Sequence, residues 1–479
     1  MLLKYFYDTK LAQASYLVGC QKTGEAIVVD PARDITPYLA TAKAEGLRIV
    51  GAAETHIHAD FVSGARELAE QGATLYLSDE GGEGWHYEYA KQYHHVPLKD
   101  GSVFTIGNIR FEVLHTPGHT PEHISFVVTD GGNAQTSQQP LGIFSGDFVF
   151  VGDVGRPDLL EKAAGVSGST NMLAKKMFES LQRFKMLPDF LQLWPGHGAG
   201  SACGKALGAI PSSTVGYEKM TNWALQTEDE ATFVTNLLAG QPEPPRYFAK
   251  MKEINRMGPT LLSSVGVPDR SSVDWKTAVH WASEGTLLDV RKAVDFASAH
   301  IRGSINIPAN KSFVTWAGWL LPYDQPIYLL AEESTVEAIL HDLSSIGLDN
   351  VAGIMDSSVV DAAPPDSDNI SSYQNVSVEE ARDRIASGAV HLVDVRNLSE
   401  WQAGHVATAH HHMLGELLAH VGELPRNKPI LLQCQTGGRS AIASSLLTAH
   451  GFSDVENLAG GYEAWRMSEQ KAAMASSVS

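Results

Sequence analysis

Short apolar segments alternate with amphipathic stretches along roughly the first 250 residues. The apolar runs Glu25–Asp30 and Leu47–Ala53 predict buried strands, and the pattern of Ile35–Glu45 predicts a helix. The segment Val103–His115 predicts a β-hairpin that turns at Gly107 and Asn108. This part of the chain therefore combines strands and helices.

An internal repeat follows. Asp289 and Asp394 lie 105 positions apart, and so do His300 and His405, so the two copies keep one register. Each copy continues to a second apolar strand, at 326–330 and 429–433, and then to a helix. Strands that alternate with helices predict a doubly wound parallel α/β sheet in each copy.

Two stretches interrupt these patterns and predict connectors. The first is the proline-rich Gln241–Pro245, and the second is rich in Asp, Pro and Ser at 361–371. The predicted organisation is a first domain over 1–250, a first copy over 251–360, a linker over 361–372 and a second copy over 373–479.

The net charge and the number of cysteines limit the partners and the cellular compartment that we expect for this chain. Asp and Glu number 55 against 36 Lys and Arg, a net charge of −19, which argues against binding to nucleic acid or to anionic membranes. No stretch approaches the roughly 20 apolar residues of a membrane span, and no secretory signal is recognisable at the N-terminus. The three cysteines are too widely spaced for a disulfide framework, so a cytoplasmic location is expected.

Histidine and aspartate gather in four separated segments of the first domain. They are Thr55–Phe61, His115–Thr120, Ser145–Asp147 and Pro195–Gly198. The first follows a predicted strand and resembles the H-x-H-x-D-H signature of the metallo-β-lactamase superfamily, with Phe61 where the last His normally stands. Phenylalanine cannot ligate a metal, so this departure points to one metal rather than two.

Gly155–Asp158 adds to the resemblance, which is closest to the persulfide dioxygenase branch of that superfamily. It implies an αββα sandwich and one Fe(II) per chain, held by the two-His, one-carboxylate set of His56, His119 and Asp147. It further implies that His58, Asp60 and His197 orient the ligands or the substrate, and that Arg156 supports the loop. Zinc is the alternative metal, bound by His56, His58, His119 and a water. His115 and His123 are interpreted as structural.

A second candidate site is Cys434, placed between a predicted strand and a predicted helix. Backbone N–H groups at a helix N-terminus, with Arg439 nearby, are expected to stabilise a thiolate and lower the pKa of this cysteine. The loop Cys434–Ser440 resembles that of the rhodanese sulfurtransferases, which implies that Cys434 carries a persulfide. By that resemblance the surrounding loop holds the transferred sulfur or the donor's oxygens, through Gln435, Thr436, Gly437, Gly438 and Ser440.

The first copy has no cysteine between residues 204 and 433, and Glu332 and Glu333 fall where the active loop would be. It is therefore interpreted as a spacer or docking domain. Cys203 lies six residues after His197. It is either a catalytic thiol at the substrate channel that relays sulfur, or a packed loop cysteine.

The order of domains is similar to that of bacterial fusion proteins that detoxify sulfide-derived persulfides. The resemblance implies oxidation of a low-molecular-weight thiol persulfide by O₂ to sulfite and thiol, with Cys434 moving sulfane sulfur to or from thiosulfate. Two alternatives stay open: a zinc thioester hydrolase of the glyoxalase II kind fused to a rhodanese domain, and a non-enzymatic sulfur carrier or sensor. Assembly into a homo-oligomer also stays open.

Overall fold

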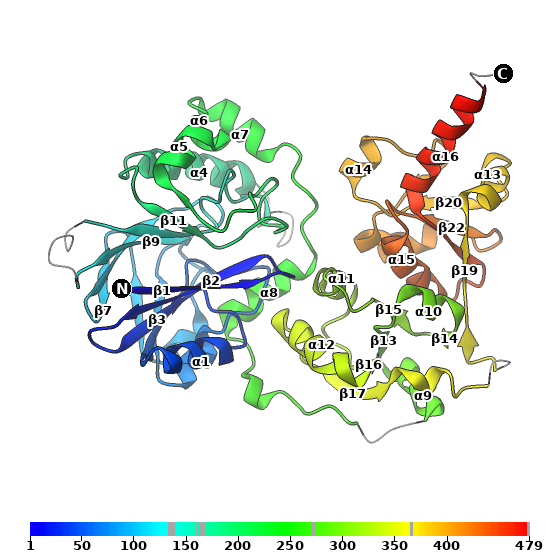
Figure 1. Ribbon diagram of the computed structural model, residues 1–479, viewed down its shortest axis with the longest axis horizontal. Coiled ribbons are helices and arrows are strands. Elements are labelled where there is room, and N and C mark those ends of the chain that lie inside the picture. The colour runs from blue at the N-terminus through cyan, green and yellow to red at the C-terminus, as the bar shows by residue number, and fades with distance from the viewer. Residues whose placement is uncertain (133–138, 160, 162–167, 271–273, 365–366, 477–479) are drawn as a thin grey trace. The chain divides into compact units, whose positions relative to one another are not determined.

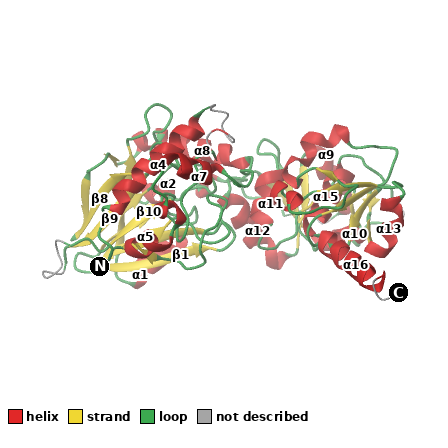
Figure 2. Cartoon of the chain, turned by 90° about the horizontal axis from the view of Figure 1, so that it is seen from above, coloured by secondary structure: helices red, strands yellow, loops and turns green. Residues whose placement is uncertain are grey.

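The chain forms two compact units in a computed structural model that describes residues 1–132, 139–159, 161, 168–270, 274–364 and 367–476 (Figure 1). The first unit comprises Met1–Val265 with Leu343–Gly347, and the second comprises Gly266–Asp342 with Leu348–Ser479. Within each unit, helices enclose the strands (Figure 2).

The first unit contains two six-stranded sheets. The first sheet has the order β1-β2-β3-β4-β5-β6, with antiparallel pairs from β1 to β3 and parallel pairs from β3 to β6. Its strands are β1 (Leu2–Asp8), β2 (Gln13–Cys20), β3 (Glu25–Val29), β4 (Arg48–Ala53), β5 (Thr74–Ser78) and β6 (His95–Leu98).

The second sheet has the order β12-β11-β10-β9-β8-β7, and only β10 and β11 are parallel. Its strands are β7 (Val103–Ile106), β8 (Ile109–His115), β9 (Ile124–Asp130), β10 (Gly142–Gly146), β11 (Gln192–Pro195) and β12 (Ser213–Thr214). The predicted hairpin is the β7–β8 pair, and Gly107 adopts the positive φ of 56° that its turn requires.

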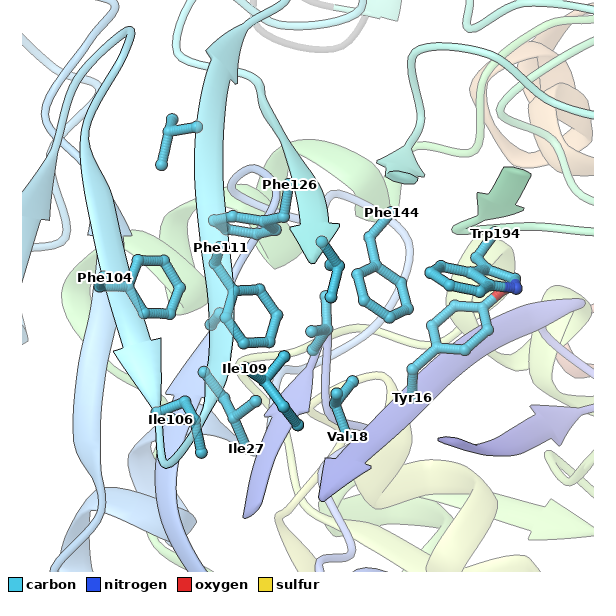
Figure 3. Packing of buried hydrophobic residues seen from close by; sticks show 14 of the residues in the cluster. Tyr16, Val18, Ile27, Phe104, Ile106, Ile109, Phe111, Phe126, Phe144 and Trp194 are labelled. Carbon is cyan, nitrogen blue, oxygen red and sulfur yellow. The ribbon is translucent and has the colours of Figure 1, made fainter. Parts of the chain in front are cut away.

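Aromatic and branched side chains fill the space between the two sheets (Figure 3). The stacked rings of Phe104 and Phe111 have centroids 4.9 Å apart, and Tyr16 lies 5.0 Å from Phe144. Each fully buried side chain of this size contributes about 1.5–3 kcal/mol to stability. The two sheets therefore form one rigid sandwich.

Helices cover both outer faces of the sandwich. α1 (Thr36–Ala44) and α2 (Ala65–Glu70) pack on the first sheet, and α4 (Ser169–Lys185) and α7 (Glu230–Leu238) pack on the second. Among the described residues, this unit also contains α5 (Val215–Thr221), α6 (Trp223–Gln226) and α8 (Tyr247–Met257), with the 3₁₀ helices η1 (Glu88–Gln92) and η2 (Leu262–Ser264). This is the predicted αββα sandwich.

The second unit contains the two copies of the repeat. The first copy has a parallel sheet of order β15-β13-β16-β17. Its elements are α9 (Trp275–Glu284), β13 (Thr286–Asp289), α10 (Ala293–Ser298), β14 (His300–Ile301), β15 (Ile305–Asn306), α11 (Phe313–Leu320), β16 (Ile327–Ala331), α12 (Glu333–Ser345), β17 (Val351–Asp356) and η3 (Ser357–Val360).

The second copy has a parallel sheet of order β19-β23-β22-β20-β21. Its elements are β19 (Gln374–Val376), α13 (Val378–Ala386), β20 (His391–Asp394), α14 (Leu398–Gln402), β21 (His410–His411), η4 (Leu414–Glu423), β22 (Ile430–Gln433), α15 (Gly438–Ala449), β23 (Val455–Leu458) and α16 (Gly461–Ser476). The predicted fold class, a metallo-β-lactamase sandwich followed by two α/β domains, is confirmed.

Part of the predicted linker is paired rather than free. Strand β18 (Ile370–Ser371) pairs with β14 of the first copy, whereas residues 365–366 lie outside the described part of the chain. Among the described residues, no helix is both long enough and apolar enough to cross a membrane.

Candidate metal centre and sulfur-transfer site

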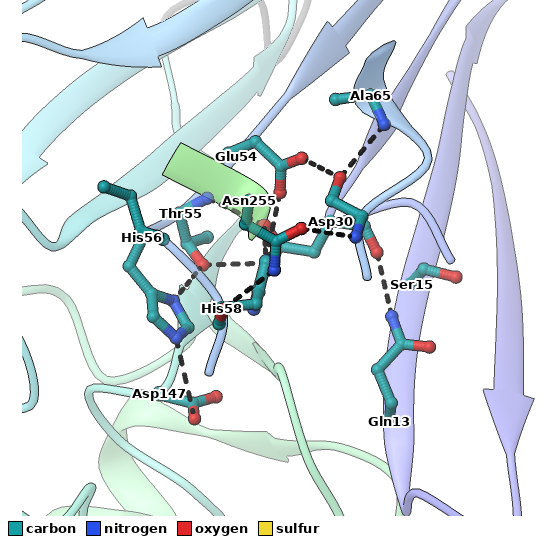
Figure 4. Close-up of polar contacts among 12 residues, drawn as sticks. Gln13, Ser15, Asp30, Glu54, Thr55, His56, His58, Ala65, Asp147 and Asn255 are labelled. Carbon is teal, nitrogen blue, oxygen red and sulfur yellow. Dashed lines mark hydrogen bonds and ion pairs between the residues drawn. The ribbon is translucent and has the colours of Figure 1, made fainter. Parts of the chain in front are cut away.

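The ends of three strands bring the predicted metal ligands together. His56 follows β4, His119 lies in the β8–β9 loop, and Asp147 follows β10. One ligand atom of each residue lies within 4.8 Å of the others. His56 points at Asp147, and its Nε2 lies 3.8 Å from Asp147 Oδ2 (Figure 4). His119 Nε2 lies 3.5 Å from the same oxygen, so all three side chains face one point.

The other ring nitrogen of each histidine is held by the protein. His56 Nδ1 lies 3.0 Å from the hydroxyl of Thr55, which itself donates to Asp30. His119 Nδ1 donates to the backbone carbonyl of Arg156 at 2.9 Å. With Nδ1 protonated, each Nε2 presents its lone pair to the shared point, as metal-binding histidines do.

Two glycines next to the candidate ligands allow the loops that carry them to pack closely together. Gly146, immediately before Asp147, has a φ of 50°, and a Cβ there would lie 2.4 Å from Thr55 Oγ1. At Gly196 a Cβ would lie 2.6 Å from Asp147 Oδ1. A larger residue at either position would push the ligand loops apart.

Burial makes the three side chains suited to a metal. Burial and the neighbouring His58 hold the pKa of His56 well below its ordinary value, and burial also lowers the pKa of His119. His56 Nε2 and Asp147 Oδ2 are buried and have no hydrogen-bond partner among the described residues. Buried polar atoms are rarely left unpaired, and neutral imidazole with carboxylate is a common metal-binding set. The residues therefore fit a metal ion.

His58 is turned towards two carboxylates instead. Its Nε2 lies 3.0 Å from Glu54 Oε2 and 3.2 Å from Asp30 Oδ1, and these charges raise its pKa well above the ordinary value against the effect of burial. The ring of the buried Phe61 packs 4.4 Å from that of His58. These contacts hold only Nε2, whereas His58 Nδ1 is buried and has no hydrogen-bond partner among the described residues, so one ring nitrogen stays free for a metal.

Asp60, His197 and Cys203 form a second buried cluster beside Asp147, with ligand atoms within 4.8 Å of one another. His197 Nε2 lies 3.2 Å from Asp60 Oδ2 and 3.5 Å from Asp147 Oδ1. Burial, with the charges of Asp60 and Asp147, raises the pKa of the Cys203 thiol well above its ordinary value. The structure thus places Cys203 beside the candidate metal ligand Asp147, where its neighbours favour the neutral thiol.

Arg156 is fully buried and forms a two-pronged ion pair with Asp158, both contacts at 2.7 Å. Its backbone N–H donates to the carbonyl of Cys203 at 3.0 Å, while its own carbonyl accepts from His119. Arg156 therefore links the loop that carries Cys203 to a metal ligand.

Three residues near the centre have roles that the sequence did not reveal. His123, interpreted as structural, accepts a hydrogen bond from the backbone N–H of Asp147 at 3.0 Å. Asp30 binds both Thr55 and His58. Asn255 of α8 donates to the carbonyls of His58 and Phe61 and so fixes the motif loop. The only available signal was the closeness of His123 to the motif that carries His119.

The Cys434 loop has the predicted position between β22 and α15. Cys434 is 1% exposed, the backbone N–H of Gly437 donates to its sulfur at 3.1 Å, and the hydroxyl of Ser440 lies 3.4 Å from that sulfur. Gly437 has a φ of 102°, which favours glycine. One backbone N–H of the predicted cup therefore lies at the sulfur, with a hydroxyl beside it, and the loop precedes a helix of 12 residues.

Two arginines border this loop. Arg439 forms two contacts of 2.6 Å with Glu400 of α14. Arg396 is held by Asp394 at 2.7 Å and reaches Gln435 at 3.3 Å. Both guanidinium groups are thereby fixed beside the loop that carries the sulfur.

A cavity of about 870 Å³ opens next to Cys434, Thr436, Gly438 and Arg439. Its opposite wall comes from the first copy, with Val290, Arg291, Lys292, Asn310, Trp316 and Glu332 among the lining residues. The sequence predicted only a spacer or docking role for this copy. The structure instead makes it part of the Cys434 site.

Comparison with known families agrees with this architecture. Residues 8–197 match the metallo-beta-lactamase superfamily, and residues 274–360 and 377–468 each match the rhodanese-like domain. A crystal structure of a metallo-beta-lactamase from Staphylococcus aureus subsp. aureus COL is 47% identical, covers 74% of this chain and 98% of that chain, and superimposes with a TM-score of 0.66. The chain belongs to the metallo-β-lactamase superfamily and carries two rhodanese-like domains.

The curated relatives include proteins with different activities. A hydroxyacylglutathione hydrolase of Rhodopseudomonas palustris is 30% identical over 50% of this chain and 80% of its own length. The human mitochondrial persulfide dioxygenase ETHE1 is 27% identical over 41% of this chain and 68% of its own length. The beta-lactamase hydrolase-like protein of Xylella fastidiosa is 28% identical over 48% of this chain. The match covers 53% of that relative, so this chain spans about half of the relative's length.

Proposed function

We propose that the chain is a persulfide dioxygenase fused to a sulfurtransferase. The first reaction is RSSH + O₂ + H₂O → RSH + SO₃²⁻ + 2H⁺, at one Fe(II) held by His56, His119 and Asp147. The observation that carries this proposal is a buried set of two histidines and one carboxylate among the described residues, next to a Phe61 that cannot ligate a second metal. Bound there, Fe(II) would supply the one-electron chemistry that O₂ requires.

The protein's own residues prepare this site. Thr55 and the carbonyl of Arg156 keep the imidazole rings aimed at the shared point. The Asp60–His197 pair lies against Asp147 and fixes the orientation of its carboxylate. Because these groups are buried, bulk water is kept from the reacting sulfur, and their geometry is set before the substrate arrives.

The second reaction is sulfane sulfur transfer at Cys434. The Cys434 thiolate attacks the outer sulfur of RSSH, the old S–S bond breaks, and RS⁻ leaves and takes up the proton. Sulfite then attacks the outer sulfur of the Cys434 persulfide, which gives thiosulfate and returns the thiolate. The N–H of Gly437 and the hydroxyl of Ser440 support the charge on the Cys434 sulfur.

A zinc thioester hydrolase is the second candidate, favoured by the similarity to the hydroxyacylglutathione hydrolase. In that candidate His58 is the third nitrogen ligand, through its free Nδ1. Metal content after anaerobic purification, together with O₂ uptake on addition of a persulfide, separates the two candidates.

The ligand assignment predicts the effect of Asp147→Ala. This change removes the only carboxylate of the set, so iron content and persulfide-dependent O₂ uptake should both be lost. Cys434-dependent sulfur transfer should persist, because Cys434 belongs to the other compact unit. Asp130→Ala, remote from the ligand loops, is the control, and full iron in Asp147→Ala would refute the assignment.

A further inference from the structure

We infer that the cavity beside Cys434 binds a whole thiol persulfide that carries both a carboxylate and an ammonium group. Selection for this class comes from Lys292 and Glu332 of the cysteine-less first copy. This inference deepens the proposed function and rests on sulfur transfer at Cys434.

The wall supplied by the first copy has a fixed position within the second unit. The backbone N–H of Asn306 in β15 donates to the hydroxyl of Ser445 in α15 at 3.0 Å. Trp319 of α11 packs so closely on Gly415 that a Cβ there would lie 2.3 Å from the indole. The two copies are therefore packed together beside the cavity, and the first copy shapes the site whether or not it reacts.

The cavity is much larger than an inorganic sulfur donor needs. Its volume of about 870 Å³ falls in the range of roughly 300–1,000 Å³ that encloses small organic ligands. A sulfite or thiosulfate ion would fill a small part of it. Val290, Trp316 and Ile442 add apolar surface that an organic thiol would cover and an inorganic anion would not.

The charges in the wall define the substrate class. Arg291 is paired with Asp289 at 2.7 Å, and Arg439 is paired with Glu400 at 2.6 Å. Lys292 and Glu332, by contrast, are exposed and make no ion pair within 4.0 Å among the described residues. A free ammonium and a free carboxylate in one cavity complement a ligand with the opposite pair of charges.

Glu332 also offsets the attraction of Lys292 for small dianions. A carboxylate in the cavity repels thiosulfate, whereas it attracts the ammonium group of an amino-acid-containing thiol. The first copy would thus direct Cys434 towards the organic persulfide as sulfur donor. The chemical step is the one described for the second reaction: the outer sulfur passes to Cys434, and the thiol leaves with one proton.

The test compares two sulfur donors on two variants. Glutathione persulfide carries carboxylate and ammonium groups, and the persulfide of 2-mercaptoethanol carries neither. For Lys292→Met and for Glu332→Gln we expect kcat/KM for loading of Cys434 to fall about tenfold with glutathione persulfide, mainly through KM. With the uncharged persulfide it should stay within about twofold.

Matched controls come from the same copy but do not line the cavity. They are Lys311→Met and Glu333→Gln, whose carboxylate faces Arg270. Loading is read as the mass of one added sulfur on the peptide that contains Cys434. Equal losses for both donors, no loss at all, or equal losses in the controls would overturn the inference.

A failure of the proposed function would look different. Cys434→Ser should abolish loading of that peptide by either donor. If the parent protein itself fails to load Cys434, the sulfurtransferase proposal falls. If the parent loads Cys434 but the two variants keep the parent's preference for glutathione persulfide, only the selectivity inference falls.

Discussion

The two rhodanese-like copies share a parallel α/β scaffold and differ at the connection that follows β16 in the first copy and β22 in the second. In the first copy Arg291 is held by Asp289, and in the second Arg396 is held by Asp394, each at 2.7 Å. The sheet register places Leu330 beside Asp289 and Gln433 beside Asp394, so Ala331 occupies the position of Cys434.

The connection that follows this position is different in length. In the second copy, residues 434–437 separate β22 from α15, and the backbone N–H of Gly437 donates to the Cys434 sulfur. In the first copy only Glu332 separates β16 from α12, so no comparable loop exists. The same scaffold thus gives a cysteine-bearing loop in one copy and a wall for the shared cavity in the other.

Moving the cysteine tests whether the loop, rather than the thiol alone, makes the site. In the double variant Cys434→Ser with Ala331→Cys, we expect thiosulfate formation from glutathione persulfide and sulfite to fall to the uncatalysed rate, a loss of roughly 1,000-fold or more. The assay is run anaerobically, with Cys434→Ser as the reference. If the cysteine placed at position 331 restores thiosulfate formation, the loop around Cys434 is not what distinguishes the two copies.

His300 and His405 occupy corresponding positions in the two copies, and the pH dependence of the free energy of unfolding should distinguish them. His300 is buried, and burial lowers its pKa to about 4. Since the pKa of an unfolded His is about 6.5, the unfolded chain binds the extra proton first. The stability contributed by neutral His300 is therefore present above about pH 6.5 and is lost as the pH falls towards 4, by up to about 3 kcal/mol.

Urea unfolding of the second unit between pH 7 and pH 4 measures this loss. His300→Asn should flatten the pH dependence, and His405→Asn, at the exposed position in the second copy, is the matched control. An unchanged pH dependence in His300→Asn would contradict the assignment of the effect to this residue.

The Arg439–Glu400 ion pair belongs to the second copy. Its loss should lower the rate of sulfur transfer less than moving the cysteine does. Glu400→Gln removes the charge that fixes Arg439 beside the sulfur. We expect kcat/KM for sulfur transfer to fall about tenfold, equivalent to about 1.4 kcal/mol. Glu379→Gln, on the exposed side of α13, is the control and should leave the rate within about twofold of the parent. An equal loss of rate in both variants would show that Glu400 does not act by holding Arg439.

Much of this architecture was accessible from the sequence because its signals are local. The apolar run Leu47–Ala53 predicted β4, and the constant spacing of the repeat predicted two α/β copies. The cysteine between an apolar strand and a glycine-rich turn predicted the loop now seen around Cys434.

The contacts that the sequence did not reveal join distant positions. Asn255 reaches His58 and Phe61 across nearly 200 residues, and His123 supports Asp147 from another strand. Lys292 and Glu332 line the cavity of a cysteine more than 100 positions away. Such contacts follow from tertiary packing and leave no periodic trace in the chain.

The central claim is that the two reactions are carried by separate sites in one chain. Its most direct test is O₂ uptake with simultaneous product analysis in Cys434→Ser, given glutathione persulfide in air. We expect O₂ uptake to persist, sulfite to accumulate and thiosulfate to form only at the uncatalysed rate, because the substituted serine keeps the loop but is not ionised near neutral pH. Thiosulfate formed as fast as in the parent protein would contradict the account and would turn attention to Cys203.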